Sequence, residues 1–526
     1  MTIKGKVKSG EYFDSVTLMI VGRDVSAAKG VADAAVVMGT KENKAILKAS
    51  GLWLAEFDKA DDTDLLLAVK AEQEETAAAA LQAAEEQLKK VRSRTSTSKE
   101  QKPRSIEGAI KALPGANLAL ISVAGRYAGA LAHKALDAGL HVMLFSDNVS
   151  IETEVELKKR AREKGLLVMG PDCGTAIING APLGFANIVR RGDVGIVAAA
   201  GTGLQEVSSI LSNEGAGVSQ AIGTGGRDVK QDVGGIMFLE GIKALMEDDA
   251  TRVIVLVGKP FHESVLAKVG KAIKASSKPV VGVLLGAEAA DLRRLGMIPA
   301  ATLEEAALLA VSLSKGSSGA NGRRAPGLDA RQKELAALAA KEAVKAAESQ
   351  RDVRGLFSGG TFCTEAQVVF RGLKVGGVSS NVPLAPYLPV KDVLKSKGHT
   401  FIDLGDDVFT VGRPHPMIDF SLRKRRIIDE ANDPRTAVIL LDVVIGCGSN
   451  MDPVSELAPA IVEARRLAEK ARRNLIFATS VTGTPADPQD RGKVEAGLRK
   501  AGALVFPSNA AAATFAARVA MCLEAQ

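Results

Sequence analysis

The chain has 526 residues, 46% of them hydrophobic and only 4% aromatic, and 68 Lys and Arg against 61 Asp and Glu give a formal net charge of +7. The low aromatic content disfavours the binding of single-stranded nucleic acid by base stacking. The sequence also lacks a Lys/Arg-rich helix of the kind that binds a nucleic-acid duplex. The four cysteines form no CxxC pair, the N-terminus lacks a signal-peptide pattern and no apolar run is long enough to span a membrane, so we expect a cytoplasmic protein without disulfides, a metal site or a membrane anchor.

Two segments predict linkers because they combine Ser, Gly, Pro and charged residues: Arg92–Ser105 and Lys315–Gly327. They divide the chain into three blocks, and a chain of this length suggests about three or four domains. The basic runs Lys89–Arg104 and Arg423–Arg426 are expected to be solvated.

The first block, residues 1–91, predicts a small α+β domain. Its short apolar stretches alternate with helical segments and are Ser15–Val21, Ala34–Met38 and Leu65–Val69. Residues Glu72–Val91 are rich in Ala, Glu and Lys and predict an exposed helix. No catalytic cluster is evident in this block.

The second block, residues 104–314, alternates apolar strands with helical segments. The predicted strands are Leu118–Val123, His141–Phe145, Leu167–Met169, Val194–Ala198, Gly217–Ile222, Val253–Val257 and Val280–Leu284. Continuous runs of Val, Ile and Leu predict strands that are buried on both faces, and hence doubly wound parallel sheets of the α/β class. The length suits two such domains, residues 104–185 and residues 186–314.

The third block, residues 328–526, opens with a helical run and predicts a further parallel α/β domain. Its predicted strands are Val353–Phe357, Thr400–Leu404, Val438–Val444, Leu475–Thr479 and Ala503–Phe506.

Glycine-rich turns follow four of these strands, where an open parallel sheet binds its ligands. At such a turn, glycine lets an anion approach the free amides at a helix N-terminus, although each turn taken alone is equally well explained as a tight connection. The candidate residues for binding phosphate or an acyl phosphate are Gly201, Thr202, Gly203, Gly225, Gly226, Gly359, Gly360, Gly446, Cys447, Gly448 and Ser449.

One histidine stands out among five. His415 lies in a polar stretch with Asp403, Asp406, Asp407 and Arg413, between two prolines that restrict its backbone, which suits packing or catalysis equally. Cys173 follows a predicted strand, where a small structural thiol is the more usual explanation than a reactive one.

Several segments, in this order, resemble the acyl-CoA synthetase superfamily typified by succinyl-CoA synthetase: VMGPDCGTAI, GDVGIVAAAGTGLQEV, AIGTGGRD, KPVVGVLLG and VILLDVVIGCG. Within it, SVAGRYA, FSDNVS and DLGDDVFTVGRPHPMID are most similar to the FdrA proteins. The resemblance covers nearly the whole chain. It implies a Rossmann-like CoA-binding-type domain at 104–185, an α-subunit-like flavodoxin-like domain at 186–314, and a domain like the carboxyl-terminal part of the β subunit at 328–526.

The resemblance also implies a site in which two helix N-termini, one from each half, share one anion, at the turns Gly201–Gly203 and Gly446–Gly448. The synthetase's relay histidine is missing from the segment after PVVGVLLG, and Lys259 stands where the synthetase has its partner glutamate. Neither the glycine-rich CoA-binding turn of the synthetase nor its ATP-grasp domain has a counterpart here.

FdrA proteins are associated with oxamate carbamoyltransferase, which forms oxamate and carbamoyl phosphate from oxalurate and phosphate. The resemblance therefore implies a carbamoyltransferase subunit of purine degradation that acts with partner subunits on small anionic substrates, with phosphate as a substrate. Arg227 and Lys259 are the candidate cationic clamps and His415 the candidate acid or base. The alternatives are an acyl-CoA ligase completed by a partner, which would use CoA and a nucleotide, and a non-catalytic subunit that senses an anion.

Overall fold

The computed structural model describes residues 1–11, 13, 15–26, 28–40, 43–44, 47–48, 50–96, 103, 105–316, 325, 327–410 and 415–525, with the backbone alone for 15, 16, 19, 23 and 92–96. Half of the first predicted linker, most of the second, and Arg413 lie outside the described residues. The chain forms two compact units, Met1–Gly115 with Asp406–His415, and Ala116–Gly405 with Pro416–Gln526. Each unit has its own hydrophobic core.

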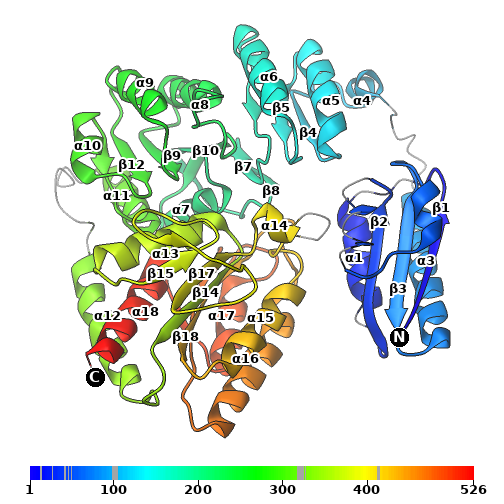
Figure 1. The fold of residues 1–526 in the computed structure, drawn as a ribbon. Helices are drawn as coiled ribbons and strands as arrows, with labels where there is room; N and C mark the ends of the chain where they lie inside the picture. The colour runs from blue at the N-terminus through cyan, green and yellow to red at the C-terminus, as the bar shows by residue number, and fades with distance from the viewer. Residues whose placement is uncertain are drawn as a thin grey trace. The chain divides into compact units, whose positions relative to one another are not determined.

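The first unit contains a three-stranded antiparallel sheet in which β3 (Leu65–Ala71) lies between β1 (Thr2–Lys8) and β2 (Val31–Met38) (Figure 1). The central strand is buried on both faces, because long helices cover one side of it and a short 3₁₀ helix covers the other. The helical elements are α1 (Ser15–Ser26), η1 (Ala55–Lys59), α3 (Glu74–Ser96), α4 (Ile106–Ala112) and α14 (Asp407–Thr410).

Two elements of this unit differ from the expectation. The apolar stretch Ser15–Val21 is the first part of helix α1 rather than a strand. Strand β1 was not predicted, because Lys4, Lys6 and Lys8 alternate with its other residues and give it a polar appearance. These lysines form ion pairs with glutamates of α3, so the polar positions face a helix.

The second unit begins with a small parallel sheet, β4–β5–β6, as expected for a Rossmann-like domain. Its elements are β4 (Leu118–Ile121), α5 (Gly125–Asp137), β5 (His141–Leu144), α6 (Ile151–Glu163) and β6 (Val168–Met169).

A seven-stranded sheet follows, in the order β13-β12-β11-β9-β10-β7-β8. Its five parallel strands have the flavodoxin-like order 2-1-3-4-5. The hairpin of β7 and β8 extends this sheet by antiparallel pairing with β10, so it belongs here although it precedes the predicted boundary at residues 185/186. The elements are β7 (Thr175–Ile178), β8 (Ala181–Gly184), β9 (Arg191–Ala198), α7 (Gly201–Asn213), β10 (Val218–Gly223), α8 (Ile236–Glu247), β11 (Val253–Gly258), α9 (Glu263–Ile273), β12 (Val280–Leu284), α10 (Ala289–Arg294), β13 (Ile298–Pro299) and α11 (Leu303–Ser314).

The third sheet is parallel throughout, in the order β16-β15-β17-β14-β18-β19-β20, and its last five strands repeat the 2-1-3-4-5 pattern. The elements are α12 (Leu328–Ala343), β14 (Asp352–Phe357), α13 (Gly360–Gly372), β15 (Val378–Ser380), β16 (Leu388–Pro389), β17 (His399–Asp403), α15 (Ser421–Asn432), β18 (Thr436–Val444), α16 (Pro453–Lys470), β19 (Ile476–Thr482), α17 (Arg491–Lys500), β20 (Leu504–Phe506) and α18 (Asn509–Glu524).

The predicted α/β class is confirmed, and every strand predicted in these two blocks coincides with an observed strand to within three residues. The central strands are fully buried, as their continuous apolar sequences require. One hydrophobic cluster joins the two flavodoxin-like domains, and α7 and α13 lie side by side between their sheets (Figure 1). The carboxyl ends of β9 and β14 therefore lead into neighbouring helices.

Candidate functional site

The first turns of α7 and α13 meet at what we call the helix junction, residues Gly201–Gly203 and Gly359–Thr361. A Cβ atom built on Gly359 would lie 2.5 Å from Thr202 Cγ2, and one built on Gly203 would lie 3.0 Å from Thr361 Cγ2. Each threonine thus occupies the space beside a glycine of the other helix. A side chain at either glycine would push the two helix N-termini apart.

The amide groups at the helix junction are not capped by side chains of the described residues. Ala200 and Gly359, the N-cap residues of α7 and α13, supply no side-chain acceptor. By contrast, Thr302 and Ser508 cap α11 and α18 in the usual way. Uncapped first-turn amides and the helix dipole both favour an anion, so the contact between two such termini is consistent with the predicted anion site, which stays a prediction.

A cation and a carboxylate lie over the start of α13. Lys259 follows strand β11 and Asp403 ends strand β17. A Cβ atom on Gly360 would lie 2.6 Å from Lys259 Nζ and nearer still to Asp403 Oδ2. Lys259, predicted as a cationic clamp, is therefore close to the helix junction, and the Asp403 carboxylate beside the same glycine offsets part of its charge.

A buried ion pair fixes the turn that leads into α13. The Ser358 N–H donates to Asp442 Oδ1 at 2.8 Å, and both the Ser358 hydroxyl and the Arg423 guanidinium donate to the same carboxylate. Arg423 is 1% exposed and Asp442 is fully buried. The expectation that residues 423–426 are solvated is thus wrong for Arg423, and also for Arg426, which is buried and paired with Glu430. Sequence reasoning missed this support; the only signal was an aspartate within an otherwise apolar strand.

The turn at Gly446–Gly448 is arranged differently from the expectation. The Gly446 amide donates to Gln489 Oε1 at 3.2 Å and the Cys447 amide donates to the Ala186 carbonyl at 3.0 Å. Helix α16 begins only at Pro453, with Asp452 as its own N-cap. The partner of α7 at the junction is therefore α13 and not the Gly446 turn. Among the described residues the buried Ser449 hydroxyl has no hydrogen-bond partner.

The turn after β10 is locked by ion pairs. Gly225, in the left-handed region at φ +82°, lies against Gly170 and Pro171, and Gly226 lies beside the Ala199 carbonyl that precedes α7. The Arg227 guanidinium forms an ion pair with Glu154 Oε2 at 2.9 Å and donates to the Val149 carbonyl at 2.8 Å. Arg227 is thus committed to helix α6 and to the loop before it, so the structure does not support its predicted role as a free clamp.

Asp228, the next residue, joins the same network. Its carboxylate contacts Lys158 Nζ at 2.8 Å and accepts the Phe238 amide at 2.8 Å, and Lys158 also contacts Glu154 at 2.7 Å. All three side chains are fully buried, and with Arg227 the network holds two carboxylates and two cations, so its charges balance.

The remaining candidate residues are Cys173, Cys447 and His415. Burial raises the pKa of the Cys173 thiol to about 12, so the thiolate needed for reactivity is scarce. Burial also raises the pKa of Cys447. His415 is half-buried and belongs to the first unit, so its imidazole is not placed relative to the helix junction, and its acid or base role stays a prediction.

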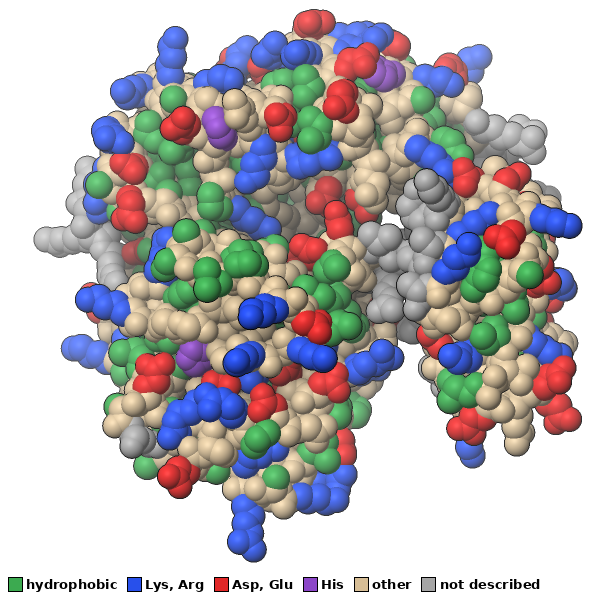
Figure 2. Space-filling model, viewed as in Figure 1, with side chains coloured by type: hydrophobic (Ala, Val, Ile, Leu, Met, Phe, Trp, Pro, Cys, Tyr) green, Lys and Arg blue, Asp and Glu red, His purple; other side chains and the backbone are tan. Residues whose placement is uncertain are grey.

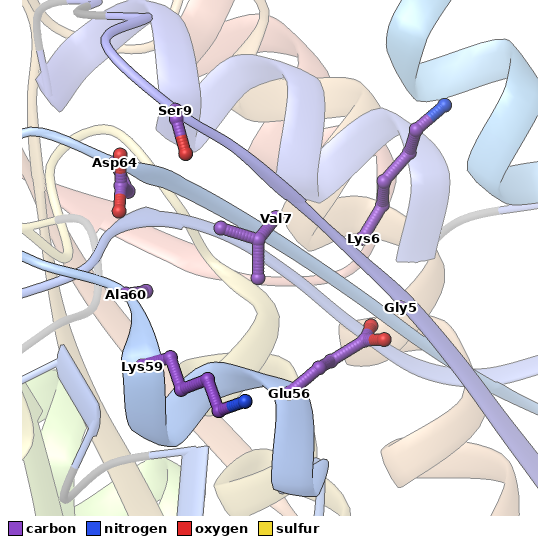
Figure 3. A pocket seen from close by; sticks show the side chains of 8 residues that line it. All are labelled: Gly5, Lys6, Val7, Ser9, Glu56, Lys59, Ala60 and Asp64. Atoms are coloured by element: carbon purple, nitrogen blue, oxygen red, sulfur yellow. The ribbon is translucent and has the colours of Figure 1, made fainter.

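The first unit has a hollow of about 380 Å³ between β1 and η1 (Figure 3). Glu56 and Lys59 of η1 lie at the hollow, whereas the Lys6 side chain points away from it and pairs with Glu85, and the Asp64 carboxylate accepts the Gly10 and Asp61 amides. The polar groups at the hollow have mixed charge. On the face shown in Figure 2, Lys and Arg side chains are interspersed with Asp and Glu. Within the described residues no helix is long and apolar enough to cross a membrane.

Comparison with known proteins gives two family models. One described as "AllF, heavy metal-associated domain" matches residues 1–104, and one described as "CoA-ligase" matches residues 356–519. Heavy-metal sites are built from cysteine and histidine, but residues 1–104 contain neither. In the described part of the chain there is also no cluster of His, Cys, Asp and Glu that could hold a metal. The donor set of this domain therefore does not fit a heavy metal.

The chain is 42% identical over 509 residues to YahF of Escherichia coli, covering 97% of both chains. It is 32% identical over 187 residues to a succinate–CoA ligase α subunit of Archaeoglobus fulgidus, covering 34% of this chain and 63% of that subunit. Two solved structures are more distant. PH0766 of Pyrococcus horikoshii is 14% identical with a TM-score of 0.33, covering 80% of this chain and 87% of that chain. ATP citrate lyase of Methanothrix soehngenii is 18% identical with a TM-score of 0.36, covering 41% of this chain and 42% of that chain.

Proposed function

The chain belongs to the family of FdrA-type proteins that includes YahF, and from this premise we propose that it is a subunit of an acyl-transferring enzyme built on the CoA-ligase fold. Phosphate, or the phosphoryl group of an acyl phosphate, would bind at the helix junction. The observation that carries this proposal is the contact between two uncapped helix N-termini with Lys259 beside them.

The chemistry follows from where charge would develop. When a phosphate oxygen attacks an acyl carbon, or an acyl phosphate is cleaved, negative charge moves between the phosphoryl group and the acyl oxygen. The first-turn amides of α7 and α13 are fixed donors and would stabilise that charge without reorganising. Lys259 would add a positive charge at the same place, and Asp403 gives it an anionic neighbour. The Asp442–Arg423 pair would hold the Ser358–Gly359 turn in position.

The reaction class that the comparisons favour is acid–thiol ligation, with CoA as the thiol substrate. Because neither a CoA-binding glycine turn nor an ATP-grasp domain was recognised in the sequence, a partner subunit would have to complete this reaction.

A second candidate, carbamoyl transfer between oxalurate and phosphate, is favoured by one specific observation. The segment from β12 through α10 to β13 contains no histidine, so the residue that relays phosphate in the synthetase is missing. Carbamoyl transfer needs an anion site but no phosphohistidine.

Both candidates can be tested on the purified chain, alone and together with proteins encoded beside it. We expect sulfate and phosphate to bind at the helix junction in isothermal titration calorimetry. Formation of carbamoyl phosphate from oxalurate and phosphate would establish carbamoyl transfer, whereas CoA binding with nucleotide-dependent thioester formation would establish ligation. If neither phosphate nor sulfate binds, or if Gly201→Asp leaves binding unchanged, the proposed site is wrong.

A further inference from the structure

Helices α7 and α13 carry the same short pattern, Gly-Thr followed four residues later by Glu. In α7 it runs from Gly201 to Glu206, and in α13 from Gly360 to Glu365. Both glutamates lie about one and a half turns inside their helices and are buried, at 2% and 0% exposure. A buried carboxylate needs strong hydrogen-bond donors, so the partners of these two groups are informative.

Glu206, from the first flavodoxin-like domain, binds the last helix of the second. Its Oε1 accepts the backbone N–H of Asn509, the first residue of α18, at 3.0 Å. Its Oε2 accepts the Thr482 hydroxyl at the end of β19. A carboxylate at the start of α18 is favourable because it meets the positive end of that helix.

Glu365 makes the reciprocal contact. Its Oε1 accepts the backbone N–H of Leu303, the first residue of α11, at 2.7 Å. Helix α11 is the last helix of the first flavodoxin-like domain. Each domain thus supplies the glutamate that holds the final helix of the other, and each glutamate sits on a helix that starts at the helix junction.

Asn509 links the two contacts. Its backbone N–H binds Glu206 and its side-chain nitrogen donates to Glu365 Oε2 at 2.7 Å. Among the described residues its buried Oδ1 atom has no hydrogen-bond partner. A half-turn of the Asn509 amide would bring that oxygen to Glu365, where a protonated carboxyl could donate to it. The site can therefore be hydrogen-bonded with Glu365 either ionised or neutral.

The surroundings of Glu365 bring its pKa close to neutral pH, where both the ionised and the neutral carboxyl are populated. Burial, above all, and then the neighbouring carboxylates Glu206 and Glu304 raise the pKa of Glu365 to about 8. Burial likewise raises the pKa of Glu206 and of Glu304. The other charged groups facing this cluster are Arg331 of α12, which pairs with Glu304, Arg491 of α17, and Glu214 after α7.

We propose that Glu206, Glu365 and Asn509 form a reciprocal clamp that positions the first turns of α7 and α13, and that the negative charge of ionised Glu365, on the helix that starts at the helix junction, repels an anion there and weakens its binding. The inference rests on the proposed function, since it assigns positioning residues to that same site. The glutamates contact no substrate; they act through the helices on which they lie.

Sulfate is a suitable probe because, unlike phosphate, it does not titrate near neutral pH. We expect calorimetry on the full chain to show that sulfate affinity falls at least threefold between pH 7 and pH 9. In Glu365→Gln the amide oxygen can still accept the Leu303 N–H, and its nitrogen can donate to a rotated Asn509. This variant should bind sulfate with the same affinity at both pH values.

A matched control separates positioning from loss of stability. The Thr302 hydroxyl caps the same helix α11 by accepting the Glu305 amide at 3.1 Å. Thr302→Ala removes this cap and leaves Glu365 in place. It should lower the melting temperature yet keep the pH dependence of the wild type. If Glu365→Gln does not fold, Glu206→Gln serves instead. It removes the Glu206 charge that raises the pKa of Glu365, so the fall in sulfate affinity should shift to lower pH.

The outcomes are distinguishable. Wild-type protein that binds no sulfate at either pH overturns the proposed function and the clamp with it. Wild-type protein that binds sulfate equally at both pH values, or a Glu365→Gln variant that keeps the wild-type pH dependence, overturns the clamp alone. A Glu206→Gln variant whose sulfate affinity falls at the same pH as that of the wild type also overturns the clamp alone.

Discussion

Two glycine-rich turns of the second unit, Gly359–Gly360 and Gly446–Gly448, both follow a fully buried parallel strand, but they use their amides in opposite ways. The first turn leads directly into α13 and has no side-chain cap. The second gives its amides to Gln489 and to the Ala186 carbonyl, and the next helix has its own cap in Asp452. Glycine content marks a tight turn, whereas the free donors decide whether that turn can bind an anion.

The comparison also separates two reasons for glycine. Gly446 has φ +132°, which a side chain rarely adopts, so its role is conformational. Gly359 has an ordinary extended φ of −143° and is needed because Thr202 of α7 fills the adjacent space. Substitutions in these turns, in their support and in the clamp behind them can break or sharpen this distinction.

The largest effect is expected when the support of the Gly359 turn is broken. Asp442→Ala leaves the Arg423 guanidinium buried without its counter-charge, which costs about 3–5 kcal/mol in the free energy of unfolding. Urea denaturation measures it. Arg425→Ala, on the exposed side of the same helix α15, is the control and should change stability by less than about 0.5 kcal/mol. Equal stability of the two variants would show that the pair does not hold the turn.

The next effect concerns pH. Glu365 has a higher pKa in the folded protein than in the unfolded chain, so its contribution to stability is complete below the unfolded pKa and is lost as pH rises to about 8. The wild type should therefore lose stability between pH 6 and pH 8.5, on the order of 2 kcal/mol. Glu365→Gln should lose less, as judged by urea denaturation at pH 6 and pH 8.5. A steeper loss in the variant would contradict the assignment.

Gly446→Ala should cost about 1–2 kcal/mol, because alanine is strained at positive φ and would also crowd the Asn187 side chain and the Phe185 and Ala186 carbonyls. Sulfate affinity at the helix junction should be unchanged. A large loss of sulfate binding with little loss of stability would instead identify the Gly446 turn as the anion site.

Gly359→Ala should show the converse pattern. The added methyl group meets Thr202 and separates the two helix N-termini, so sulfate affinity should fall about tenfold, or about 1.4 kcal/mol. The added Thr202→Ala substitution removes the atoms nearest to the new methyl group and should restore part of the affinity in the double variant. Calorimetry at constant pH distinguishes the three proteins, and an unaffected single variant would show that the contact is not limiting.

The smallest effect is expected for Lys259→Met, which removes one partly solvated charge and should weaken sulfate binding by about 1 kcal/mol or less at low salt. Lys271→Met, on the exposed face of α9, serves as the control. The difference between the two variants should shrink as ionic strength rises. Identical affinities at low salt would remove Lys259 from the site.

Much of the fold could be predicted because periodicity is a local property. The buried strands Val253–Val257 and Val438–Val444 are continuous apolar runs, and both lie where the sequence indicates. Strand β1 could not be recognised, since its lysines are polar for a reason that lies in α3.

The site was predicted less completely, because hydrogen bonds between distant residues leave little trace in a sequence. The turn at Gly201 leads into a helix as expected. Nothing in the sequence around Gly446 shows that the Gly446 and Cys447 amides are bonded to Gln489 and Ala186. Arg423 looks like a surface residue until its partner Asp442 is known. Arg227 was likewise expected to contact a ligand but contacts Glu154 instead.

The reciprocal contacts of Glu206 and Glu365 also bear on how the molecule could be divided. If the polypeptide were cut between Gly316 and Gly327, each fragment would keep one glutamate whose partner helix lies in the other fragment. Neither fragment would be complete alone, and co-expression should recover a folded heterodimer where separate expression gives aggregates. The two flavodoxin-like halves are thus covalently joined but structurally complementary, in the manner of two subunits that have been fused.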